Sequence, residues 1–386
     1  MDISSDGRYF MNRFPDGEAP DPSELVASLE SAVQQIGDLL LTHATSEEDE
    51  DGRGIYSGRL GIIYAFFLRR DPIWQQLVPN SGLKHLRKDG VTLLNCDILD
   101  CVLRGDKDCL VEYANRAAKL DKHACEVFSG RAGCISALLL ANRLHPDIHL
   151  DNELSVLVEQ IVREGLAHGG PTFMWIWHGK EYLGAIHGTA GILYVLMRFL
   201  KDNRELADPA LYERIVETVD WILRTYSLPT GNIQSSTRNH SDQLVHFCHG
   251  ATGWIPVLCL LAEENPEGPH KTYASRLGGV VWERGLLATK GPGLCHGISG
   301  SICGLIDLFR STRDRVWLQR AGWFARFLAN QWRVIAVKAD RPYSLFEGLA
   351  GAYLALSIVL EETRLCSNEA AIRSDMKPYM SSFPGF

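Results

Sequence analysis

Residues 247–253 read F-C-H-G-A-T-G, and residues 294–300 read L-C-H-G-I-S-G. Both stretches contain the pattern Gly-x-x-Gly, which occurs six times along the 386-residue chain. The six copies are Gly58/Gly61, Gly130/Gly133, Gly188/Gly191, Gly250/Gly253, Gly297/Gly300 and Gly348/Gly351. Successive copies are 47 to 72 residues apart, which is about the length of a helix pair. The chain is therefore predicted to be a helical repeat.

Two kinds of helix are predicted to alternate along the chain. An apolar segment follows each glycine pair, as in W-I-P-V-L-C-L-L-A after Gly253, and a helix that is apolar all round is buried on all sides. The segments between the copies are amphipathic. One is predicted to start with Asp208 as N-cap and Pro209 at the first helical position, and another starts in the same way from Asp21 and Pro22. No long stretch alternates with the period of two that is typical of strands.

This alternation predicts two concentric layers, with half-exposed outer helices wrapped around buried inner ones. We predict an all-α fold, an α/α toroid of about seven helical hairpins, formed by residues 1–386 as a single domain. The 72-residue gap between the first two glycine pairs leaves room for a degenerate second repeat around 91–120, where no such pair occurs.

Composition excludes several classes of function. The formal charge is −8, so no overall basic field would attract nucleic acid or an anionic membrane. The longest apolar runs are too short to cross a bilayer, and the N-terminal stretch lacks the apolar region of a signal peptide. We therefore expect a cytoplasmic monomer without a transmembrane segment. Its ten cysteines are expected to be thiols or metal ligands rather than a disulfide framework.

The two Cys-His-Gly stretches precede neighbouring inner helices at the same phase of the repeat, so their side chains should meet at one mouth of the ring. Cysteine and histidine together suit Zn²⁺, and three protein ligands with one open position are typical of a catalytic zinc site. The four candidate ligands are Cys248, His249, Cys295 and His296. Spacing alone does not choose among them.

At these residues the sequence resembles the lanthionine synthetase C-like family, and its eukaryotic, glutathione-binding branch in particular. The resemblance covers essentially the whole chain. Its matching stretches are F-S-G-R-A-G (128–133), Y-L-G-A-I-H-G-T-A-G (182–191), D-Q-L-V-H-F-C-H-G-A-T-G (242–253), K-G-P-G-L-C-H-G-I-S-G (290–300) and P-Y-S-L-F-E-G-L-A-G (342–351). The family fold is a double-layered toroid with seven hairpins, which agrees with the prediction from the glycines.

The resemblance also implies a chemistry. It implies that Cys248, Cys295 and His296 bind zinc, while His249 faces elsewhere as a supporting residue. It further implies that His187 is the acid/base, assisted by Glu126. The implied reaction is addition of a thiol, glutathione in the eukaryotic branch, to dehydroalanine or dehydrobutyrine in peptides or proteins, which gives a thioether.

Further residues are expected near the mouth. The basic contacts of the family to glutathione match Lys290 and Arg8, while Glu347 either holds a mouth group or caps an inner helix. We expect Trp175 and Trp177 to serve packing rather than substrate binding. Eukaryotic members often have Arg where this chain has Ser241, which removes one expected basic contact.

Three other interpretations use the same residues. The toroid could be a non-catalytic module that binds zinc and glutathione and reports on redox state, although a zinc frame alone needs neither His187 nor Glu126. A zinc hydrolase would hold water at the open position, but two cysteine ligands weaken the metal as an acid. Protein prenyl transferases share helical toroids and zinc, but they use a carboxylate ligand and a partner subunit, and this sequence indicates neither.

Overall fold

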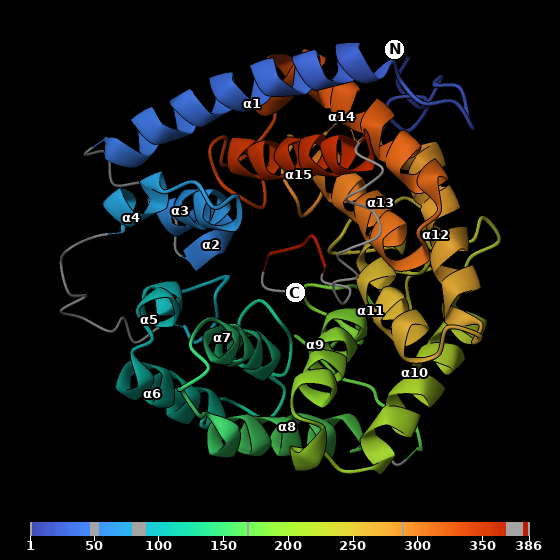
Figure 1. The fold of residues 1–386 in the computed structure, drawn as a ribbon. Helices are drawn as coiled ribbons and strands as arrows, with labels where there is room; N and C mark the ends of the chain where they lie inside the picture. The colour runs from blue at the N-terminus through green and yellow to red at the C-terminus, as the bar shows by residue number, and fades with distance from the viewer. Residues whose placement is uncertain are drawn as a thin grey trace.

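Two concentric rings of helices make up the fold in the computed structural model (Figure 1), which describes residues 2–46, 54–78, 90–167, 170–287, 289–367 and 381–384. The inner helices are α3 (Arg59–Leu68), α5 (Ile98–Arg104), α7 (Arg131–Leu144), α9 (Thr189–Asp202), α11 (Ala251–Glu264), α13 (Ile298–Thr312) and α15 (Leu349–Ser367). The outer ones are α1 (Pro22–Thr45), α4 (Ile73–Leu77), α6 (Lys107–Ala118), α8 (Asp151–Gly165), α10 (Ala210–Tyr226), α12 (His270–Arg284) and α14 (Arg315–Ala336). The short helices α2 (Gly54–Ser57) and η1 (Arg204–Leu206) lie between these elements, and no strand forms in the ranges above. The predicted all-α toroid is confirmed.

The outer helices bury one face, as their apolar spacing predicts. In α10 the buried side chains include Leu211, Ile215, Val219, Ile222 and Leu223, while charged residues cover the opposite face. Helix α1 starts as predicted, because the side chain of its N-cap residue Asp21 accepts a hydrogen bond from the Glu24 N–H.

The start of α10 was predicted one residue too early. This helix begins at Ala210, with Pro209 in the N-cap position. The Asp208 carboxylate still accepts the Ala210 N–H, at 2.8 Å. Among the described residues, no helix combines the length and apolar character required to cross a membrane.

The inner helices are enclosed on all sides, and the ring closes where the first outer helix meets the last hairpin. Every residue from Ala251 to Ala262 of α11 is buried. Helix α1 packs against α14 and α15 (Figure 1). Ion pairs such as Arg326–Glu24, at 2.6 Å, follow this seam, but exposed pairs add little to stability. Apolar burial therefore holds the ring closed.

A single geometric cause explains the second glycine of each of the six pairs. The second glycine of each pair lies in the first turn of an inner helix, where it packs against the carbonyl oxygen of the residue six positions earlier. A Cβ atom there would approach that oxygen to between 1.8 and 2.4 Å. The oxygens belong to Ile55, Val127, Ala185, Phe247, Leu294 and Leu345. No other amino acid allows the loop to fold back this tightly onto its own helix.

Gly250→Ala is expected to lower the free energy of unfolding by about 3 kcal/mol. Gly250 has a φ of +107°, and a Cβ atom would lie 2.1 Å from the Leu244 carbonyl oxygen. Chemical denaturation measures the effect. The control is Gly279→Ala in α12, where nothing lies within 4 Å, and there alanine should stabilise the helix by up to about 1 kcal/mol. Equal effects of the two substitutions would contradict this account.

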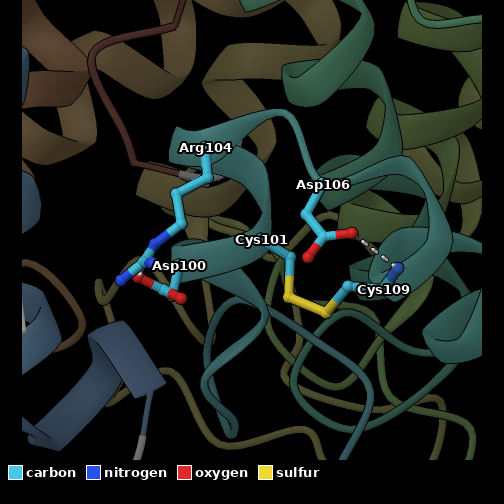
Figure 2. Close-up of a disulfide and its surroundings, with 5 residues drawn as sticks. All are labelled: Asp100, Cys101, Arg104, Asp106 and Cys109. Atoms are coloured by element: carbon cyan, nitrogen blue, oxygen red, sulfur yellow. Dashed lines mark hydrogen bonds and ion pairs between the residues drawn. A yellow bond between two sulfur atoms is a disulfide. The ribbon is translucent and has the colours of Figure 1, made fainter. Parts of the chain in front are cut away.

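The segment predicted as a degenerate second repeat contains the seven-residue inner helix α5 and the outer helix α6. Two of its cysteines differ from the expectation that the cysteines are thiols or metal ligands. Cys101 and Cys109 form a disulfide that joins the two helices, with their Cα atoms 6.1 Å apart (Figure 2). The chain reverses at Gly105, which has a φ of +67°. This tight turn brings the two sulfur atoms together.

Candidate functional site

The candidate site is built from two repeated positions, which are the two residues before the first glycine of each copy. The earlier position is occupied by Tyr56, Phe128, Ile186, Cys248, Cys295 and Phe346. The later position is occupied by Ser57, Ser129, His187, His249, His296 and Glu347. Since every copy leads into the N-terminus of an inner helix, the repeat delivers these side chains to the same mouth of the ring.

Backbone hydrogen bonds lock four of these loops to one another. The Phe346 N–H donates to the Tyr56 carbonyl at 3.1 Å, and the Cys295 N–H donates to the Phe346 carbonyl at 2.8 Å. The Cys248 N–H in turn donates to the Cys295 carbonyl at 3.3 Å. The side chains that face the mouth are therefore carried by a continuous hydrogen-bonded belt.

Cys248, Cys295 and His296 form a group that could hold a metal ion, since their ligand atoms all lie within 4.8 Å of one another. In a tetrahedral zinc site with Zn–S bonds of about 2.3 Å, two sulfurs stand roughly 3.8 Å apart. The ligand atoms of Cys248, Cys295 and His296 are therefore close enough to serve as three zinc ligands, with a fourth position left open. The same three residues are the zinc ligands that the family resemblance implies.

His249, the fourth candidate ligand, does not belong to this group. Its ring lies 5.5 Å from the Tyr182 ring, and its Nδ1 atom is buried without a hydrogen-bond partner among the described residues. Burial lowers the pKa of His249, which keeps the ring neutral.

The pKa values of the two buried thiols are shifted in opposite directions. The hydrogen bond to Cys295, together with burial, raises the pKa of Cys248 well above its usual value. Burial acts in the same direction on Cys295, but hydrogen bonds from Cys248 and His296 hold the pKa of Cys295 well below that of an ordinary thiol. These hydrogen bonds therefore favour the thiolate form of Cys295, which is the form of cysteine that binds metal.

Tyr56 completes this group and was not singled out by the sequence analysis. A hydrogen bond from Tyr56 also lowers the pKa of Cys295. The Tyr56 ring stacks on Phe346, with centroids 5.0 Å apart, and meets the edge of Phe128 at 5.1 Å. The phase of the repeat could have identified this residue, because Tyr56 stands in its copy where Cys248 and Cys295 stand in theirs.

Tyr56→Phe is expected to weaken zinc binding by about tenfold, the lower end of the effect of removing a residue that supports a metal ligand. Phenylalanine keeps the two ring contacts and deletes only the hydrogen bond to Cys295. Competition for zinc with a chromophoric chelator measures the affinity. Tyr212→Phe on the outer helix α10 is the control. Unchanged zinc affinity in Tyr56→Phe would contradict the supporting role.

His187 and Glu126 form the second polar group at the mouth. The His187 Nδ1 atom lies 2.9 Å from the Glu126 Oε2 atom, and Glu126 is only 1% exposed. The Glu126 carboxylate also accepts the N–H groups of Phe128 and Ser129, at 2.8 and 2.7 Å. These bonds fix the carboxylate, so Nδ1 of His187 carries the proton between them and Nε2 is left for other partners.

Aromatic rings hold His187 in place. The Trp177 ring stacks on the imidazole, with a centroid distance of 4.0 Å and an interplanar angle of 13°. Trp175 is buried and donates its indole N–H to the Ile161 carbonyl at 2.9 Å. Both tryptophans therefore pack, as expected, but Trp177 packs against the predicted acid/base.

The metal-binding group and the His187–Glu126 pair share one neighbourhood. The Phe128 ring lies 5.4 Å from the His187 ring and also contacts Tyr56, which hydrogen-bonds to Cys295. The backbone connects the loops of the acid–base pair as well, since the Val127 N–H donates to the Ile186 carbonyl at 3.2 Å. A substrate at this mouth could therefore meet both groups.

The predicted glutathione contacts lie around the same mouth. The charges of Arg8 and Lys290 both act on His246, whose pKa falls to about 3, mainly because the ring is buried. Arg8 donates to the Gln243 side chain at 3.0 Å, and Lys290 lies 3.8 Å from Asp340 with its side chain 54% exposed. Burial raises the pKa of Glu347, while the nearby His296 opposes this shift. The roles of Arg8, Lys290 and Glu347 stay predictions.

Asp242, the neighbour of Ser241, is well paired. Arg284 from α12 lies 3.0 Å from the Asp242 carboxylate, which also accepts hydrogen bonds from Asn232 and Thr230. Burial opposes these contacts, but together they keep the pKa of Asp242 low. A basic partner for Asp242 is therefore present, and it comes from α12 rather than from the residue before Asp242.

Comparison with known proteins places these features in a family context. The family model described as "Lanthionine synthetase C-like protein" matches residues 103–367. Over 248 residues the chain is 32% identical to the Danio rerio protein named Glutathione S-transferase LANCL1, covering 62% of this chain and 60% of that protein. It is 33% identical over 236 residues to LanC-like protein GCL1 of Arabidopsis thaliana, covering 58% of this chain and 53% of that protein.

The matched region therefore spans less than two thirds of either curated relative. Among solved structures, nisin cyclase has the same fold, with a TM-score of 0.63 at 16% identity, covering 85% of this chain and 93% of that one.

Proposed function

Since this chain belongs to the lanthionine synthetase C-like protein family, we propose that it adds a thiol to dehydroalanine or dehydrobutyrine residues of peptides or proteins. Glutathione is the proposed thiol. The observation that carries the proposal is the presence of a Cys₂His donor group and a buried His–Glu pair at one mouth. The relative named a glutathione S-transferase supports the choice of thiol.

Activation of the thiol is the first requirement, because a free thiol has a pKa of about 8.5 and is mostly protonated at neutral pH. Zinc, held by Cys248, Cys295 and His296, would bind the substrate sulfur and lower its pKa. Tyr56 and the hydrogen-bonded belt keep these three ligands in position. Two sulfur ligands would keep the net charge of the site low, which leaves the substrate sulfur nucleophilic and disfavours hydrolysis.

Protonation of carbon is the second requirement. The reaction forms a bond between sulfur and the β-carbon and breaks the double bond of the dehydroamino acid, and the electron pair moves to the α-carbon and its carbonyl. His187, protonated at Nε2 as well as at Nδ1, would deliver its Nε2 proton to the α-carbon, while Glu126 holds Nδ1–H. The thiol loses one proton and the α-carbon gains one, so no oxidant or reductant is needed. Trp177 fixes the plane of the imidazole.

Binding of glutathione is the third requirement. Glutathione is an anion at neutral pH, and Arg8 and Lys290 supply positive charge at the mouth. The long Lys290–Asp340 contact of 3.8 Å and the exposure of the lysine side chain leave it available to a ligand. We expect these charges to act on the binding of glutathione rather than on the proton transfer.

The test is an assay on purified protein with its zinc content measured. The protein is incubated with glutathione and a dehydroalanine-containing peptide, and mass spectrometry detects the thioether adduct. Adduct formation well above the uncatalysed rate, at about one zinc per chain, would support the enzyme.

Two other outcomes would overturn the proposal. Full zinc content without catalysed adduct, across several peptides, would favour a non-catalytic module that binds zinc and glutathione. Zinc-dependent hydrolysis of peptide or ester without added thiol would favour a hydrolase. The single-domain extent of 1–386, the monomeric state and the cytoplasmic location stay predictions.

A further inference from the structure

A cavity of about 390 Å³ lies at the opposite end of the inner helices from the candidate site. The inner helices start at the mouth that carries the cysteines, and this cavity is lined by residues from the later turns of α3, α7, α9, α13 and α15. The segment 381–384, which is seen in the middle of the ring in Figure 1, forms one wall. Its volume is within the range of small-molecule sites.

Positive charge dominates the lining. Five arginines contribute to it, whereas Glu361 is the single carboxylate among the lining residues that the structure describes. The five are Arg69, Arg70, Arg143, Arg198 and Arg310. This contrasts with the chain as a whole, which has a formal charge of −8. Guanidinium groups converging on a cavity can bind carboxylate or phosphate in a bidentate manner.

Four of the five arginines are held in place by neighbouring carboxylates. Arg310 lies 2.7 Å from Glu362, and Arg69 lies 2.5 Å from Glu361. Arg143 and Arg198 both reach Asp202, at 3.1 and 3.2 Å. Arg70 is exposed and forms no ion pair with any carboxylate in the described ranges. The cluster is therefore arranged before any ligand arrives, which reduces the entropic cost of binding.

The rest of the lining combines hydroxyl donors with an apolar wall. Burial raises the pKa of both Tyr64 and Tyr194, so each keeps its proton and can donate it. The apolar wall is formed by Leu68, Leu139, Leu140, Leu354 and Ile358. A ligand that uses the whole cavity would have a compact anionic group and an apolar body.

We propose that this cavity is a binding site for a small organic anion whose phosphate or carboxylate group meets the arginines. The apolar body would lie against the leucine side chains. The site would be distinct from the zinc and glutathione mouth, and the two are separated by the segment 381–384. In that segment Ser382 accepts a hydrogen bond from Arg310 at 3.1 Å, and Phe383 stacks on Phe247 at 3.8 Å.

Isothermal titration calorimetry on the full chain tests the proposal. Phenyl phosphate and benzoate are the probes. Inorganic phosphate and benzyl alcohol are the controls, because the first has only the anionic group and the second only the apolar body. At least one of the two aromatic anions should bind saturably, and at least about tenfold more tightly than the two fragments. Comparison of phenyl phosphate with benzoate identifies the preferred anionic group.

The variants locate the site. Arg70→Gln and Arg143→Gln should each weaken binding of the preferred anion by about tenfold. Arg204→Gln is the control, because Arg204 lies outside this cavity, where it pairs with Glu264 and has a side chain that is 79% exposed. Arg70 is itself exposed, so Arg70→Gln should fold normally, and a thermal melt verifies this.

Binding should persist in Cys295→Ala, which separates this proposal from the proposed enzyme. Loss of binding in Cys295→Ala would place the anion at the zinc mouth and overturn the inference. Absence of saturable binding of either aromatic anion at millimolar concentration would overturn it as well. Equal weakening by Arg204→Gln would do the same, because it would indicate a non-specific charge effect.

Discussion

Cys295→Ala is expected to abolish both zinc binding and thioether formation. Cys295 carries the lowered pKa in the donor group and receives hydrogen bonds from Cys248, His296 and Tyr56. Its loss removes one of only two sulfur ligands. Zinc affinity should therefore fall by more than about 100-fold, the upper end of the loss found for residues that merely support ligands. Atomic emission analysis after dialysis measures the zinc content, and the adduct assay measures activity.

The control for this variant is Cys303→Ala. Cys303 is buried in α13, eight residues further along the chain, and does not belong to the metal-binding group. The Cys303→Ala variant should keep its zinc and activity but lose some stability, because a buried sulfur is removed. If Cys295→Ala retained stoichiometric zinc, the assignment of the metal site would be wrong. If both variants lost zinc equally, the effect would be one of folding.

His187→Gln is expected to lower the rate of adduct formation by about 10²- to 10⁴-fold, the usual contribution of a general acid or base. Glutamine can still donate to Glu126 and stack under Trp177, but it cannot deliver a proton. Zinc content and glutathione binding should be unchanged, since His187 lies outside the metal-binding group. Single-turnover kinetics with zinc-loaded protein measure the rate.

A closely matched control exists for His187 on the outside of the ring. His123 also places its Nδ1 atom 2.9 Å from a glutamate, Glu164, but its side chain is 44% exposed. His123→Gln should leave the rate unchanged. A His187→Gln variant that keeps its rate within about threefold, well under the usual effect of a proton donor, would remove His187 from the mechanism.

The glycine pattern predicted the architecture because it has one steric cause that acts locally. Each second glycine contacts a carbonyl only six residues away, so the signal lies within a single loop and survives in the sequence. The burial of the inner helices is equally local, since α11 is apolar in composition on every face. Both features could be predicted without knowing how the ring closes.

Features that depend on contacts between loops were harder to predict from the sequence. Tyr56 meets Cys295 only because four loops are joined by the backbone belt, and Arg284 meets Asp242 from 42 positions away. The Cys101–Cys109 disulfide depends on how tightly the chain reverses between α5 and α6. Spacing alone did not choose between His296 and His249 as the metal ligand. The family resemblance implied His296, and the structure places His296 in the metal-binding group.

The closure of the ring by α1 has a consequence for synthesis of the protein on the ribosome. Glu24 in α1 pairs with Arg326 in α14, which is 302 positions later in the chain. At about 5 to 20 residues per second, roughly 15 to 60 seconds separate the emergence of these two partners. During that interval the apolar face of α1 lacks its two main partners, α14 and α15. We therefore expect the nascent chain to depend on chaperones until its last hairpin leaves the ribosome.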